Sequence, residues 1–274
     1  MLFLCAFCVF AENSFAQNPD FLAETVKRGN VEQKREALRV IRNLESETAS
    51  RLAVPALRDS AEIVRATAAF AVIFLPPGEA LAVLSPLLSD KKELVRREAT
   101  YALGEVRNPN AVARLLQVFE KDKIAEVRNA AIVALGEIGD AAAIDVLTGI
   151  LRRKPKRDDE ADDFLRRAAA RSVGQIAQII QTGKTKVVTP QKFPTEQTAQ
   201  PAPPNFPRLA EQFPIFRPAI NVLINVLQNA GESGDARREA AFALGAIGDA
   251  AAIPALRLNL NNPDYYLAEI SREA

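Results

Sequence analysis

Apolar residues recur along this chain with the spacing of α-helices. In one stretch Val95, Ala99, Ala102, Leu103 and Val106 fall at i, i+4, i+7, i+8 and i+11, which places them on one helical face. A second apolar stripe follows the first, as in Ile144, Leu147, Ile150 and Leu151 and again in Ile253, Leu256 and Leu260. No stretch of useful length alternates with period two, so the chain is predicted to be all-α.

The helical pattern is itself repeated. An alanine with a basic residue three positions before it marks each copy, and the alanines are Ala37, Ala68, Ala99, Ala131, Ala169 and Ala240. Two copies, Val127–Leu147 and Ala236–Leu256, are identical at 13 of 21 positions. A helix pair of roughly 31 residues cannot bury its apolar stripe alone, whereas stacked pairs bury a continuous core. We therefore predict a right-handed α-solenoid of about six stacked helical hairpins.

Small and acidic residues recur at fixed places in the copies. The aspartates Asp59, Asp90 and Asp122 precede the first helix of a copy, where we expect them to act as N-caps. Gly139 and Gly248 are expected to end first helices. A further glycine stands five residues after the marker alanine in four copies and is expected to let neighbouring helices approach closely; these are Gly104, Gly136, Gly174 and Gly245.

The motif D-x-x-x-x-V-R-x-x-A-x-x-A-L-G-x-I-G-D-x-x-A-I-x-x-L is similar to the short HEAT-like repeats of phycobilisome lyases. The first two copies depart from it, because Arg42 and Ile73 stand where the glycine belongs. The resemblance covers residues 29–180 and 215–274. It implies the fold, but not the function, since the repeat occurs in lyases, hydroxylases and scaffolds.

Two segments interrupt this organisation. Residues 1–16 resemble a signal peptide, because Leu2–Ala11 is apolar but too short to span a bilayer and Ser14 and Ala16 suit cleavage after Ala16. The alternative is a buried N-terminal helix. The second segment, residues 182–214, is rich in proline and separates repeats in 17–181 from those in 215–274. It is either a solvated linker or a strap along the repeats, and its phenylalanines favour the strap.

Export would place the protein in the periplasm or outside the cell. Both cysteines lie within residues 1–16, so the mature chain would have neither disulfides nor thiol chemistry. No stable insertion in the membrane is expected. The last residues, 271–274, resemble the start of another copy, which leaves open that the chain is a fragment.

Charge is balanced, with 35 Lys and Arg against 34 Asp and Glu. One basic residue per copy could track a phosphate backbone, but interleaved acids and the net charge of +1 argue against nucleic acid. We predict instead a structural ladder in which each arginine bonds an aspartate or carbonyl of a neighbouring repeat, formed by Arg65, Arg96, Arg128, Arg166 and Arg237. In residues 152–163 a basic run meets an acidic run, which predicts local pairing or a charged contact with a partner.

The sequence offers little catalytic chemistry. Deoxyhypusine hydroxylase, a relative built from such repeats, implies a di-iron centre with His-Glu motifs, but this chain has no histidine. Glu98 and Glu239 stand beside arginines and are expected to be solvated. We therefore predict no metal, no cofactor and no catalytic residue, although the residues do not exclude lyase activity.

These observations predict a non-enzymatic, exported scaffold that binds a protein or peptide. In related solenoids the second helices line the concave side, and the residues there that core packing explains least are Arg114, Gln117, Asp145, Thr148 and Arg257. The alternative is an enzyme or enzyme accessory related to phycobilin lyases or to the hydroxylase. The oligomeric state is left open.

Overall fold

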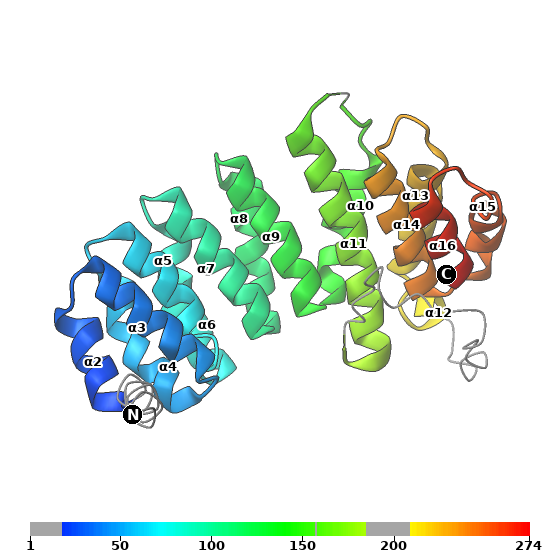
Figure 1. Ribbon diagram of the computed structural model, residues 1–274. Coiled ribbons are helices and arrows are strands. Elements are labelled where there is room, and N and C mark those ends of the chain that lie inside the picture. Colours follow the sequence, from blue (N-terminus) through cyan, green and yellow to red (C-terminus); the bar gives the residue numbers. More distant parts are fainter. Residues whose placement is uncertain (1–17, 157, 185–208) are drawn as a thin grey trace, which may run out of the picture. The chain divides into compact units, whose positions relative to one another are not determined.

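The computed structural model describes residues 18–156, 158–184 and 209–274 (Figure 1). Throughout these ranges the regular structure is helical, without strands. The chain divides into two compact units, residues 1–134 and 135–274, and the boundary falls inside helix α9 (Ala125–Ile138). Within each unit helical hairpins are stacked, which confirms the predicted all-α repeat fold.

The first unit contains stacked hairpins preceded by one additional helix. Its helices are α2 (Pro19–Arg28), α3 (Val31–Asn43), α4 (Glu47–Ala53), η1 (Val54–Arg58), α5 (Glu62–Ala71), α6 (Pro77–Leu84), η2 (Ser85–Ser89), α7 (Glu93–Val106), η3 (Pro109–Ala111) and α8 (Val112–Lys121). The first helices α3, α5 and α7 lie side by side, and α4 and α6 pack against them (Figure 1). The repeat pattern did not predict α2, which Asn18 caps and Pro19 begins.

The second unit stacks its helices in the same two rows. Its helices are η4 (Ala141–Ala143), α10 (Ile144–Arg152), α11 (Glu160–Thr182), α12 (Leu209–Gln212), α13 (Phe216–Gln228), α14 (Gly234–Ile247), η7 (Ala250–Ala252), α15 (Ile253–Arg257) and α16 (Tyr265–Glu273). One row is α11, α14 and α16, and the other is α10, α13 and α15 (Figure 1).

Small residues form the core where first helices meet. Five of the six marker alanines are fully buried, and Ala37 is 5% exposed. A Cβ atom added at Gly174 would lie 2.5 Å from the ring of Phe242, and one added at Gly136 would lie 2.5 Å from Oγ of Ser172. The prediction that these glycines admit a neighbouring helix is confirmed at both positions.

The helix ends confirm one prediction and correct another. Gly139 and Gly248 have φ of +80° and +70° and end their helices as expected. The aspartates are not N-caps. The carboxylate of Asp90 accepts a hydrogen bond from the backbone N–H of Lys92, two residues ahead, and α7 begins only at Glu93. The aspartate thus closes the turn before the helix, which leaves its carboxylate oxygens accessible to a side chain from another repeat.

One residue predicted to be in the core is exposed, and two predicted segments cannot be compared with the structure. Ile253, predicted as part of an apolar stripe, is 45% exposed. Residues 1–16, both cysteines and residues 185–208 of the proline-rich segment lie outside the described residues. In the part of the chain that is described, no helix combines the length and the apolar character needed to cross a bilayer.

Candidate functional site

The loops that precede the first helices carry a repeated clamp in the first unit. Arg65 donates from Nε and Nη2 to the two carboxylate oxygens of Asp90, at 2.8 and 2.9 Å, and from Nη1 to the carbonyl of Asp59 at 2.8 Å. Arg96 makes the same contacts with Asp122, at 2.7 and 3.0 Å, and with the carbonyl of Asp90 at 2.9 Å. Each guanidinium therefore holds its own loop through one nitrogen and the next loop through its opposite edge. We call each such link a rung.

The rungs are held as charged pairs. Burial acts to raise the pKa of Asp122, but hydrogen bonds from Arg96 and from the backbone N–H of Ile124 outweigh it, so this pKa lies below its ordinary value. The same balance, with Arg65 as the donor, lowers the pKa of Asp90. Lys34 makes a simpler rung, from Nζ to Asp59 at 2.7 Å.

Arg128 repeats only half of this clamp. Its Nη1 donates to the carbonyls of Asp122 and Lys123, at 3.0 and 3.1 Å, as the corresponding nitrogens of Arg65 and Arg96 do in their own loops. Within the first unit, the described contacts of its guanidinium are these two carbonyls of its own loop.

The rung of Arg166 is buried. Arg166 pairs through Nε and Nη2 with both carboxylate oxygens of Glu232, and each side chain is 2% exposed. It also donates to three backbone carbonyls, those of Ile150, Leu151 and Arg153. Glu232 was not predicted from the sequence, because the loop before α14 lacks the aspartate of the other copies.

In the last predicted rung the arginine, Arg237, is bound by neutral acceptors and not by a carboxylate. Arg237 donates from Nε to the carbonyl of Leu227 at 2.9 Å and from Nη2 to the side-chain oxygen of Asn259 at 3.3 Å. Its neighbour Arg238 instead reaches Asp264, at 2.9 Å.

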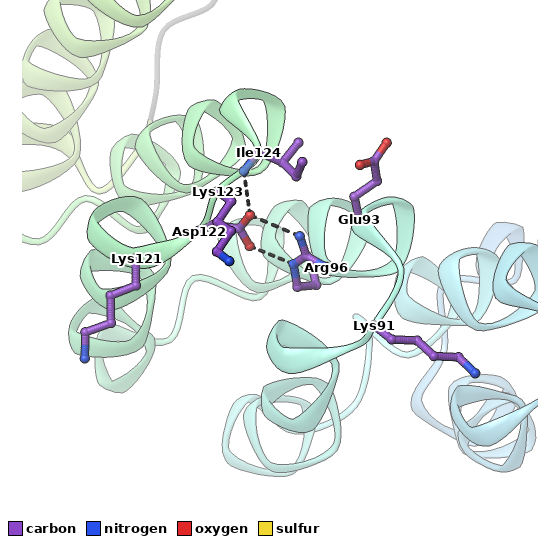
Figure 2. A pocket seen from close by; sticks show the side chains of 7 residues that line it. All are labelled: Lys91, Glu93, Arg96, Lys121, Asp122, Lys123 and Ile124. Atoms are coloured by element: carbon purple, nitrogen blue, oxygen red, sulfur yellow. Dashed lines mark hydrogen bonds and ion pairs between the residues drawn. The ribbon is translucent and has the colours of Figure 1, made fainter.

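A basic depression of about 370 Å³ surrounds the rung of Arg96. Figure 2 shows the Arg96–Asp122 pair between the side chains of Lys91 and Lys121. These two lysines and Lys123 are exposed. The rung is neutral as a pair, so the lysines leave the depression positively charged despite Glu93, which also lines it.

An acidic depression of about 570 Å³ lies in the second unit, around the loop between α10 and α11. The acidic residues that line it are Asp158, Asp159, Glu160, Asp162, Asp163 and Glu232. Part of the predicted local pairing is present, because Lys156 lies 3.5 Å from Asp159 and donates from its backbone N–H to Asp162. A backbone hydrogen bond from Asp162 lowers the pKa of Asp159.

These residues do not fit the metal site that the hydroxylase resemblance implies. The chain has no histidine. Among the described residues, no three His, Cys, Asp or Glu side chains are arranged to hold a metal ion.

The glutamates expected to be solvated are paired instead. Glu98 lies 2.8 Å from Arg97, and Glu239 lies 2.9 Å from Arg171 of the adjacent helix; each glutamate is 23% exposed. Burial raises the pKa of Glu239 despite the opposing effect of Arg171.

The predicted binding residues lie on three helices. Arg114 and Gln117 are on α8 of the first unit, and Asp145 on α10 and Arg257 on α15 belong to the second; all four are exposed. Thr148, on α10, is only 2% exposed and so offers no hydroxyl at the surface. Its helical position is part of the packed stripe beside Leu147 and Leu151. Binding by the other four stays a prediction.

The stacked hairpins and their rungs define an α-helical repeat protein. Residues 51–124 and 81–174 match the model for HEAT repeats, and residues 236–262 match the model for the PBS lyase HEAT-like repeat. The chain therefore contains HEAT repeats, one of them of the phycobilisome-lyase type, as its motif predicted.

Two curated relatives are similar to parts of this chain. One is a deoxyhypusine hydroxylase of Aspergillus oryzae, 30% identical over 135 residues, which are 47% of this chain and 38% of the relative. The other is the bilin biosynthesis protein PecE of Nostoc sp., 37% identical over 67 residues, which are 24% of this chain and 26% of the relative. The chain thus spans well under half the length of each.

The names of these relatives correct the prediction that the chain is not an enzyme, since both belong to enzymatic or biosynthetic systems. Among solved structures, an engineered protein is similar with a TM-score of 0.53 and 19% identity, over 93% of this chain and 67% of that one. That likeness concerns the fold alone.

Proposed function

We propose that this chain works in an enzyme system of the bilin-lyase or hydroxylase kind, in which its HEAT repeats hold a protein partner. The observation that carries the proposal is the 37% identity to a bilin biosynthesis protein together with a PBS lyase HEAT-like repeat in residues 236–262. The rungs support it physically, because they fix successive loops and so keep exposed polar side chains at regular places.

A hydroxylase-like oxidoreductase is the second candidate. Identity of 30% over 135 residues favours it. The absence of histidine from all 274 residues counts against it, because the implied di-iron site needs imidazole ligands. We therefore place the lyase-type role first, with Arg114, Gln117, Asp145 and Arg257 as the proposed partner contacts.

The experiment is affinity capture of the tagged full chain from its native cell extract, with crosslinking, mass spectrometry, an absorption spectrum and an iron assay. A captured protein crosslinked near Arg114 or Arg257, with tetrapyrrole absorbance in the complex, is the expected result. Stoichiometric iron without a chromophore would move the assignment to the hydroxylase. A preparation that contains no partner, no chromophore and no iron would overturn the proposal.

We also propose export, on the basis of the apolar run Leu2–Ala11 and the small residues Ser14 and Ala16. Intact-mass measurement of the protein isolated from its native cells tests this. A mature chain beginning at Gln17 is expected, and a chain that retains residues 1–16 would contradict export.

A further inference from the structure

We draw no further inference here: the strongest candidate, the row of exposed amide side chains of Asn221, Asn225 and Gln228 along one face of α13 in the second unit, carries no proposal because nothing in the described part of the chain shows what covers that face.

Discussion

The two units join neighbouring repeats with the same kind of rung in different surroundings. In the first unit the partners are 25 or 26 residues apart, and the side chains of the rungs of Arg65 and Arg96 are 8–16% exposed. In the second unit Arg166 and Glu232 are 66 residues apart, with the proline-rich segment between them, and both are almost wholly buried. A rung is therefore set by which loops the stacking brings together, and not by a fixed distance in sequence.

The units also differ in how closely their first helices pack. In the second unit Gly136 and Gly174 lie directly against side chains of the adjacent helix. In the first unit the equivalent residues of the first two copies are Arg42 and Ile73. The second unit thus combines a nearly fully buried rung with glycine contacts, whereas the rungs of Arg65 and Arg96 in the first unit are less completely buried.

The largest loss of stability is expected from Glu232→Ala. It leaves the buried Arg166 guanidinium without a counter-charge, with only carbonyls as partners. We expect a loss of about 3 kcal/mol in the free energy of unfolding, measured by urea denaturation followed by far-UV circular dichroism.

Two controls distinguish the buried charge from other effects of this substitution. Glu36→Ala removes an exposed carboxylate and should change the stability little. Arg166→Met combined with Glu232→Leu removes both charges and should restore much of the loss. If the double variant is less stable than Glu232→Ala, the stability lies in the hydrogen bonds of Arg166 to the carbonyls.

The next largest effect is expected from Gly174→Ala. The new Cβ would lie 2.5 Å from the Phe242 ring and 3.0 Å from Cα of Ala243, so overpacking of about 1–3 kcal/mol exceeds the helix-propensity gain of about 1 kcal/mol. The matched control is Gly149→Ala on α10, which meets nothing within 4 Å and should stabilise by up to about 1 kcal/mol. Equal melting temperatures for the two variants would show that the glycine contact is not tight.

Much of this fold could be predicted from the sequence because the repeats carry the same packing instructions several times. The marker alanines and Gly174 are identifiable since a buried contact between helices tolerates only small residues. The role of the aspartates was harder to predict. Asp90 caps a turn and receives Arg65 from another repeat, and a single copy of the motif does not reveal which loop its carboxylate faces.

The candidate site was less predictable than the fold. Glu232 has no motif, because its pairing with Arg166 depends on how chain segments 66 residues apart are stacked. The partial clamp of Arg128 in the first unit is likewise not evident from the sequence, where Arg128 has the same place in the motif as the other members of the ladder. The prediction for Thr148 was wrong for a different reason. As a polar residue on a second helix it was expected at the binding surface, but its side chain is buried.

The pH dependence of stability should distinguish a carboxylate whose pKa is lowered, Asp122, from one whose pKa is raised, Glu239. The pKa of Asp122 is lowered, so its charge stabilises the fold above the ordinary aspartate pKa of about 3.9, and this contribution is lost as the pH falls through the lowered value. Asp122→Asn should cost roughly 1–2 kcal/mol at neutral pH and little in strong acid. Urea midpoints measured across the acid range test this.

Glu239 in the second unit should behave in the opposite way. Burial raises its pKa, so its contribution is greatest below the ordinary glutamate value of about 4.3 and is lost as the pH rises through the raised one. The wild-type protein should therefore lose stability between acid and neutral pH, as Glu239 becomes charged. Glu239→Gln should abolish this loss. Parallel pH profiles for Asp122→Asn and Glu239→Gln would contradict the difference drawn between the two carboxylates.

The smallest effect is expected at Arg42, in the first unit. Its guanidinium lies 4.7 Å from the centre of the Phe70 ring and 3.5 Å from Glu105, at the position where four of the copies have glycine. Arg42→Ala should cost about 0.5–1 kcal/mol, because both contacts are exposed and weak. Arg42→Gly restores the repeat motif, yet it should cost about 1 kcal/mol more than Arg42→Ala, since glycine disfavours a helix more than alanine does. If Arg42→Gly is instead more stable than Arg42→Ala, then the first unit, like the second, depends on close glycine contacts between its first helices.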